Sequence, residues 1–100
     1  MLKQKNIFNF IKKNKEYLRQ ELNIEKIGIF GSFARGDQKK TSDIDLIVEF
    51  TGDISDIYEK KEALRNFFYK KFHRKIDIVR EKYLKPYIKD DILEEVRYVA

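Results

Sequence analysis

The sequence has no cysteine among its 100 residues, which excludes disulfide bonds and zinc sites with cysteine ligands. A reducing cytoplasm is the simplest setting for such a chain. No apolar run approaches the ~20 residues that a membrane-spanning helix needs. Charged residues interrupt each run, as Asp45 and Glu49 do within residues 44–50. Lys12 and Lys13 similarly interrupt the apolar residues near the N-terminus, so we expect neither a signal peptide nor a membrane association.

Proline and glycine are also scarce, with Pro86 as the single proline and four glycines in all. There is no internal repeat and no low-complexity segment, and the length predicts one domain over residues 1–100. Hydrophobic residues make up 42% and charged residues 39%, which is typical of a folded domain. The net charge of +5 favours anionic partners such as nucleotides, nucleic acid or an acidic protein surface. A lysine-rich solvated surface would have the same charge.

Hydrophobic spacing predicts helices alternating with short strands, which indicates an α/β (α+β) fold with helices packed on a sheet. We expect strands at 26–30, 43–50 and 75–79, helices at 5–22, from Asp53 or Ser55 to Phe72 and after Pro86, and a helical turn through Phe33 and Ala34. The predicted buried residues of the last two helices are Ile57, Leu64, Phe68 and Phe72, and then Ile88, Ile92, Val96 and Val99.

A Gly-Ser pair stands at the end of the first predicted strand, just before the helical turn. Gly31 lets an anion approach the backbone closely, and free N–H groups at the start of a helical turn point at such an anion. The Ser32 hydroxyl adds a further hydrogen-bond donor. The pair therefore predicts a phosphate site, although a plain strand-to-helix corner has the same sequence.

Two aspartates open the second predicted strand. Alternate residues of a strand face the same side, so Asp43 and Asp45 project together while Ile44 points to the opposite face. Two neighbouring carboxylates are costly in a fold unless a cation lies between them, and Mg²⁺ accepts carboxylate oxygens. A polar strand start that faces solvent is the alternative explanation.

A third aspartate, Asp77, lies in the middle of the short apolar strand at 75–79. An aspartate is unusual there unless it has a partner or a metal, or the strand lies at an edge of the sheet. An NTP carries about four negative charges and three aspartates add three more, so these groups can share a site only if cations neutralise them. Two divalent ions would do so, and paired metals are a known clamp for displacement at phosphorus.

Residues 31–50, GSFARGDQKKTSDIDLIVEF, resemble the signature of the DNA polymerase beta-type nucleotidyltransferase superfamily. The family pattern is Gly-Ser, ten residues and then Asp-x-Asp, and residues 31–45 have this spacing. The extended pattern G-S-x-A-R-G followed by S-D-x-D-L is also met, by Ala34, Arg35, Gly36, Ser42 and Leu46. The short chain is most similar to minimal nucleotidyltransferases of the MntA-like antitoxin group.

This resemblance implies a small mixed β-sheet flanked by helices and a metal-dependent transfer of AMP from ATP to a hydroxyl group. Asp43 and Asp45 would be catalytic ligands of two Mg²⁺ ions, for which Mn²⁺ could substitute. Asp77 would complete the metal site and help to accept a proton from the attacking hydroxyl.

The resemblance also implies the nucleotide-binding residues. Gly31 and Ser32, together with Ser42, would hold the triphosphate. Arg35 would either contact phosphate or be a structural residue of the short helix, and the sequence does not separate these two roles.

MntA-like proteins are usually encoded beside a helical HEPN toxin of the HepT type, which they silence by transferring AMP to one of its tyrosines. The resemblance therefore implies ATP and a HEPN-type toxin as partners. Two other functions stay open: a non-catalytic antitoxin that acts by binding alone, and a basic nucleic-acid-binding module. The segment FFYKKFHRK at 67–75 mixes aromatic and basic residues, but Phe68 and Phe72 fall on the core face of a helix, which disfavours nucleic acid.

Overall fold

A computed structural model describes residues 1–52 and 55–99 of the chain. Five α-helices, four strands and one 3₁₀ helix follow one another in the described residues: α1 (Gln4–Lys13), α2 (Lys15–Leu22), β1 (Ile24–Phe30), α3 (Gly31–Arg35), β2 (Ile44–Phe50), α4 (Ile57–Phe72), β3 (Ile76–Arg80), η1 (Glu81–Tyr83), α5 (Pro86–Glu95) and β4 (Arg97–Tyr98). None of the helices in the described part is long and apolar enough to cross a membrane.

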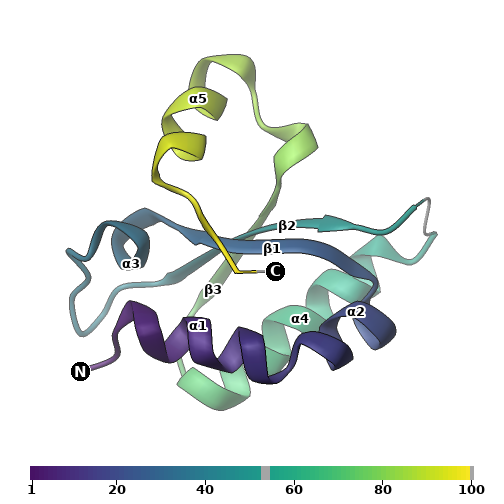
Figure 1. Ribbon diagram of the computed structural model, residues 1–100, viewed down its shortest axis with the longest axis horizontal. Helices are drawn as coiled ribbons and strands as arrows, with labels where there is room; N and C mark the ends of the chain where they lie inside the picture. The colour runs from purple at the N-terminus through teal and green to yellow at the C-terminus, as the bar shows by residue number, and fades with distance from the viewer. Residues whose placement is uncertain (53–54, 100) are drawn as a thin grey trace.

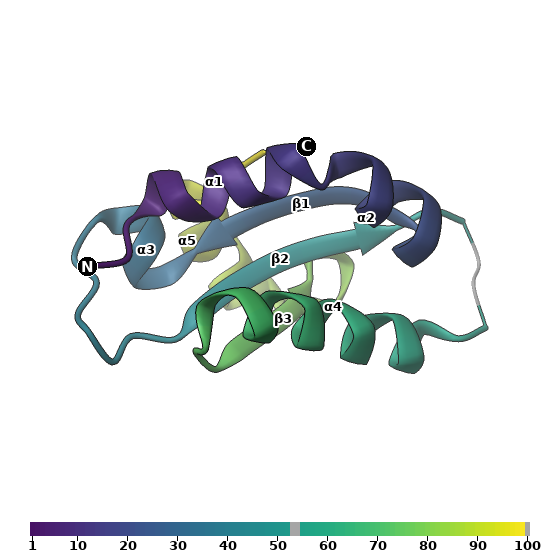
Figure 2. The same cartoon turned by 90° about the horizontal axis from the view of Figure 1, so that it is seen from below.

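The strands form a four-stranded mixed sheet in the order β3-β2-β1-β4. β1 pairs antiparallel with both β2 and β4, whereas β2 and β3 run parallel. Helices α1, α2 and α4 lie across one face of this sheet (Figure 2), while α5 lies on the other side of it (Figure 1). The predicted class, a small mixed sheet flanked by helices, is therefore confirmed.

The hydrophobic core lies between the sheet and the three helices α1, α2 and α4. Alternate residues of β2 point into it, because successive side chains of a strand face opposite sides. The sheet contributes Ile27 and Ile29 from β1, Ile44, Leu46, Val48 and Phe50 from β2, and Ile76 and Ile78 from β3. The intervening residues, Asp45 and Asp77 among them, consequently project from the opposite face of the sheet.

The predicted helix at 5–22 is two helices in the structure, which meet at Asn14. The Asn14 side-chain amide donates a hydrogen bond of 2.8 Å to the Phe10 carbonyl oxygen, and its backbone has φ −108° and ψ 18°. Asparagine side chains compete for backbone partners in this way, which interrupts a helix that hydrophobic spacing alone would continue.

The prediction for α4 holds for its centre and less well for its ends. Leu64 and Phe68 are buried, whereas Ile57 and Phe72 are only partly buried against the core. The residue at the N-terminal cap position is Asp56 rather than Ser55, and its side chain makes no capping hydrogen bond. The other candidate cap, Asp53, lies outside the described residues.

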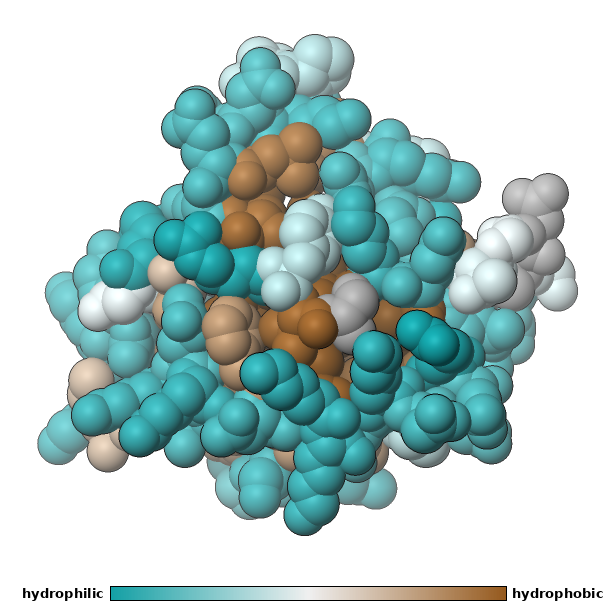
Figure 3. All heavy atoms as spheres, viewed as in Figure 1, coloured by the Kyte–Doolittle hydropathy of each residue, from teal (hydrophilic) through white to brown (hydrophobic). Residues whose placement is uncertain are grey.

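The prediction that the last helix buries its apolar residues is wrong. Nothing in α5 is buried, and Ile88 is 37% exposed. The helix ends at Glu95, so that Val96 follows it and residues 97–98 form β4; Val99 packs partly against the core. Apolar residues gather on this side of the molecule amid a mostly hydrophilic surface (Figure 3). The apolar residues of the helix have amphipathic spacing, but none of them is buried, and the main contact of α5 is with α3.

The short strand β4 reaches β1 at a glycine. Gly28 pairs with Tyr98, and a Cβ atom on Gly28 would lie 2.8 Å from the Arg97 carbonyl oxygen and 3.0 Å from the Tyr98 Cα. These contacts are too close for any side chain, so β4 can pair there only because residue 28 has none.

Gly28→Ala is therefore expected to displace β4 and to lower the free energy of unfolding by about 1–3 kcal/mol, the usual cost of overpacking. Urea denaturation measures this change. Glu25→Ala, on the exposed side of the same strand, is the control and should stay within about 0.5 kcal/mol of wild type. Equal stabilities of the two variants would contradict the assignment of β4 to this edge.

Candidate active site

Two of the three predicted aspartates lie side by side on neighbouring strands. Asp45 of β2 and Asp77 of β3 are direct partners in the parallel register. Their chain neighbours Ile44, Ile76 and Ile78 are buried in the core, so both carboxylates project from the other face of the sheet. Residues 32 apart in sequence thus bring two acidic groups to one point.

The proximity of these carboxylates changes the protonation of Asp45. The pKa of Asp45 is raised to about 6, mainly by burial of its side chain and in addition by the charge of Asp77 and a hydrogen bond with it. Asp43 adds a smaller repulsion, and Arg35 acts in the opposite sense. A carboxyl group in this position favours either a proton or a cation beside it.

Asp43 lies next to this pair without belonging to it. It immediately precedes β2 and is half-buried. Among residues 1–52 and 55–99, no three histidine or acidic side chains gather closely enough to form a ready-made metal cage. The structure therefore brings together Asp45 and Asp77, and leaves Asp43 close enough to influence Asp45 by its charge.

Gly31 has no room for a side chain, because the Asp45 carboxylate lies against it. Its φ of +72° lies in the left-handed region, and a Cβ atom there would overlap the Asp45 carboxylate. In the antiparallel register Phe30 is the partner of Asp45, which places the start of α3 beside that carboxylate. Glycine is required at this corner because the Asp45 side chain occupies the place of a Cβ.

Ser32 follows directly as the second residue of α3. It is half-buried, and its backbone carbonyl accepts the N–H groups of Gly36 and Asp37 at 2.9 and 3.1 Å. Within the described part of the chain the Ser32 hydroxyl makes no hydrogen bond to protein. A donor with this freedom beside Asp45 fits the predicted phosphate contact.

Ser42 has a clear structural role. Its hydroxyl oxygen accepts the Lys39 N–H at 2.8 Å, and its carbonyl oxygen accepts a hydrogen bond from the Arg74 guanidinium at 2.9 Å. These contacts close the turn that leads into Asp43. A contact between Ser42 and the nucleotide stays a prediction.

Arg35 is held by two carboxylates. It donates from Nε to Asp37 at 3.1 Å and from Nη1 to Glu95 at 3.0 Å. Glu95, at the end of α5, also accepts the Gly31 N–H at 2.9 Å. Nothing in the sequence singles out Glu95, because it stands beside Glu94 in an acidic helix end, and only the fold distinguishes the two residues.

Asp45 and Asp77 fit a divalent cation. Mg²⁺ is usually bound through one or two carboxylates plus substrate phosphates, so two facing carboxylates are what the protein itself needs to supply. The raised pKa of Asp45 reports a position where positive charge is lacking. Asp43 is near enough to contribute to that charge balance.

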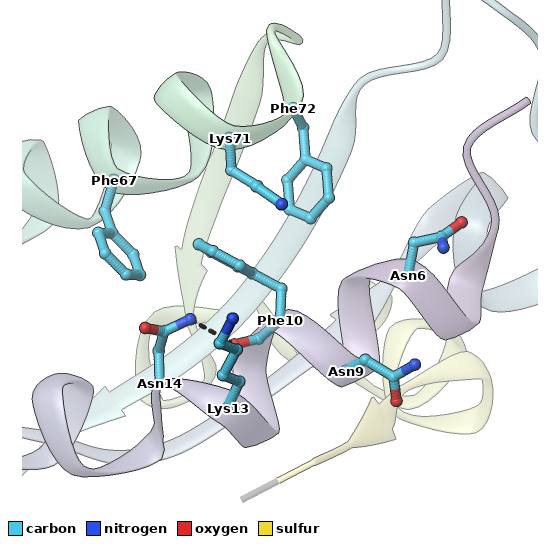
Figure 4. A pocket seen from close by; sticks show the side chains of 8 residues that line it. All are labelled: Asn6, Asn9, Phe10, Lys13, Asn14, Phe67, Lys71 and Phe72. Carbon is cyan, nitrogen blue, oxygen red and sulfur yellow. Dashed lines mark hydrogen bonds between the residues drawn. The ribbon is translucent and has the colours of Figure 1, made fainter.

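The groove with the most aromatic lining lies elsewhere, between α1 and α4 on the helical face of the sheet (Figure 4). Its volume is about 380 Å³. Phe10 packs against the rings of Phe67 and Phe72, with centroid separations of 5.0 and 5.1 Å. Because these rings pack against one another between the two helices, in tilted and edge-to-face arrangements, they are not free to stack on bases, which argues against a nucleic-acid platform on the segment at 67–75.

The fold is thus a mixed four-stranded sheet that carries two paired carboxylates on the face opposite its main core. A family model described as a nucleotidyltransferase domain matches residues 11–99, and the chain belongs to this enzyme family. In sequence, the chain is 33% identical to protein adenylyltransferase MntA of Thermococcus cleftensis, and the match covers 99% of this chain and 98% of that protein.

Solved structures share the fold. A structure classed as a minimal nucleotidyltransferase superposes with a TM-score of 0.75 at 23% identity, covering 96% of this chain and 95% of the other. A toxin–antitoxin structure with AMP-PNP superposes with a TM-score of 0.66 at 18% identity, covering 99% and 73%. A tri-AMPylated Shewanella oneidensis HEPN toxin in complex with its MNT antitoxin gives 0.63 at 17% identity, covering 97% and 71%. At these identities the similarity establishes the fold of the chain.

The charge of Asp45 should make the metal-free protein less stable as pH rises. Its pKa is 3.8 in the ordinary state and about 6 in the fold, so between these values the folded protein holds the proton more tightly than the unfolded chain. This contribution to the free energy of unfolding is therefore lost as pH rises through that window. In EDTA, the melting temperature of Asp45→Asn should be about 2–4 °C above that of wild type at neutral pH and close to it near pH 4. This difference is smaller than the full pKa shift would give, because solvent screens the charge of a half-buried group.

Thermal unfolding across this pH range, with EDTA and then with Mg²⁺, tests the expectation. Mg²⁺ should raise the melting temperature of wild type at neutral pH and leave Asp45→Asn nearly unchanged, because a ligand stabilises only the state that binds it. Asp91→Asn, on the exposed surface of α5, is the matched control. A difference between Asp45→Asn and wild type that does not grow with pH would refute the charge argument.

Proposed function

We propose that this protein transfers AMP from ATP to a tyrosine hydroxyl of a HEPN-type toxin, and so acts as an antitoxin. The sequence relative named protein adenylyltransferase MntA supports the reaction, since it matches nearly the whole chain. The solved neighbours that contain a HEPN toxin, AMP groups or AMP-PNP support the nucleotide and the kind of acceptor.

The observation that carries the proposal is the pairing of Asp45 with Asp77 directly beside the Gly-Ser corner. One end of the sheet presents two carboxylates, and the same end presents the free hydroxyl of Ser32. An NTP bound there would have its phosphates between a hydrogen-bond donor and a cation-binding pair.

The transfer forms one bond and breaks one. The tyrosine oxygen attacks the α-phosphorus of ATP, the bond from that phosphorus to the bridging oxygen breaks, and pyrophosphate leaves. Asp77 accepts the proton from the attacking hydroxyl, while Ser32 donates to a phosphate oxygen. Asp43 and Asp45 supply negative charge that would bind the cations needed to neutralise the phosphates.

The cofactor of the proposal is Mg²⁺, as two ions held by Asp45 and Asp77 with Asp43, and Mn²⁺ would serve as a substitute. Bound divalent ions neutralise phosphate charge and stabilise the attacking and leaving oxygens. Without them the carboxylates of the chain would repel the triphosphate, as the raised pKa of Asp45 already indicates for the aspartates alone.

Asp77→Asn should slow AMP transfer by about 100-fold or more, because the amide can neither accept the proton nor add charge to the metal site. The assay incubates the protein with ATP labelled in the α-phosphate, Mg²⁺ and the HEPN-family protein of the same genome. Label on the acceptor, lost with Asp77→Asn and kept with the exposed control Asp91→Asn, is the expected result.

Two outcomes would contradict the proposal. Transfer at the wild-type rate by Asp77→Asn would remove Asp77 from the reaction. Neutralisation of the toxin by wild type and Asp77→Asn alike, with no label transferred, would instead identify an antitoxin that works by binding alone.

A further inference from the structure

The C-terminal helix contacts the Gly-Ser corner through a single side chain. Glu95 accepts the Gly31 N–H at 2.9 Å with Oε1 and the Arg35 guanidinium at 3.0 Å with Oε2. These contacts span 64 and 60 residues of sequence. The Glu95 side chain is only 25% exposed, so the carboxylate is largely turned into the protein. Both of its oxygens are thus engaged at the start and the end of α3.

Gly31 is consequently held from two sides. Asp45 fills the space where a Cβ would be, and Glu95 takes the backbone N–H. Neither face of this residue remains for a ligand in the structure. The phosphate contact predicted for the corner is therefore left to Ser32, whose position depends on how the peptide of Gly31 is oriented.

Arg35 completes the connection. Glu95 and Asp37 hold its guanidinium, and its positive charge acts on Asp45 in the sense that favours the carboxylate. Charge-assisted hydrogen bonds of this kind are stronger than neutral ones and fix geometry. Losing Glu95 would free the Gly31 N–H and leave Arg35 held by Asp37 alone.

α5 adds little to the core. None of its residues is buried, and it contacts the rest of the protein mainly at α3, above which it lies in Figure 1. Removing one carboxylate from such a helix should leave the main core intact, because that cluster lies on the opposite face of the sheet and the buried β2 residue on the α5 side, Ile47, is apolar. The effect of Glu95 should therefore be local to the corner.

We propose that Glu95 is a positioning residue for the nucleotide: it orients Gly31 and Arg35 so that Ser32 faces the triphosphate, which makes the C-terminal helix part of the active site. The inference rests on the proposed function, since it concerns the same nucleotide. In this proposal Gly31 has a structural role at the corner, and Ser32 makes the contact with the phosphate.

Three variants test this role: Glu95→Ala, Glu95→Gln and the matched control Glu94→Ala. Glu94 is the exposed neighbour on the same helix. Calorimetry measures the dissociation constants of ATP and of adenosine in Mg²⁺ with no acceptor present. Amide hydrogen exchange at Gly31 reports the contact itself, and thermal unfolding reports stability.

Glu95→Ala should weaken ATP binding about tenfold, the loss expected for one charge-assisted contact, while adenosine binding stays unchanged. The Gly31 amide should exchange faster, with little change in melting temperature. Glu95→Gln should fall between Glu95→Ala and wild type, since its amide oxygen can still accept from Gly31 but its NH₂ group cannot accept from Arg35. Glu94→Ala should match wild type throughout.

Unchanged ATP affinity in Glu95→Ala would overturn the inference and leave the proposed function untouched. Tighter ATP binding would overturn it too, because Glu95 would then compete with the phosphates. Loss of ATP and adenosine binding in equal measure would show that Glu95 only supports the structure and has no specific effect on the phosphates. A wild-type protein that binds ATP but labels no HEPN acceptor would instead defeat the proposed function alone.

Discussion

Two carboxylates held next to each other on parallel strands are the constraint on which the rest of the site depends. The register of β2 and β3 makes Asp45 and Asp77 partners, and the packing of Ile44, Ile76 and Ile78 into the core fixes the face from which they project. A one-residue slip of either strand would bury a carboxylate and expose an isoleucine, so the core enforces the pairing. Folding energy from apolar burial thus maintains an electrostatic arrangement that is unfavourable without a cation.

The Gly-Ser corner at residues 31–32 connects the two carboxylates to the C-terminal helix α5. Asp45 excludes any side chain at residue 31, and Glu95 holds the N–H of the same residue. The corner is therefore defined by contacts from β2 and from α5 as much as by its own sequence. The Ser32 hydroxyl, which makes no hydrogen bond within the described residues, is the group that we propose meets an anionic substrate, in keeping with the net charge of +5.

Local patterns in the sequence predicted three of the four strands, since alternation in a strand depends on neighbouring residues alone, whereas the mixed sheet was expected from the family resemblance and β4 was not predicted. The pairing of Asp77 with Asp45 was expected from the resemblance and from its odd place in an apolar strand. The break at Asn14 comes from a local side-chain hydrogen bond that hydrophobic spacing does not reveal, whereas the exposed face of α5 and the contact made by Glu95 depend on tertiary structure. Glu94 and Glu95 are equivalent in sequence, and only the approach of α5 to α3 distinguishes them. The roles of the site residues in catalysis and nucleotide binding stay predictions.

The most direct test of the central claim is a carboxyl-carbon NMR titration of Asp45, first in EDTA and then in Mg²⁺. Without metal the pKa of Asp45 should be about 6, and it should fall towards its ordinary value when Mg²⁺ binds. An Asp45 carboxyl group that titrates near its ordinary value and does not respond to Mg²⁺ would contradict the account.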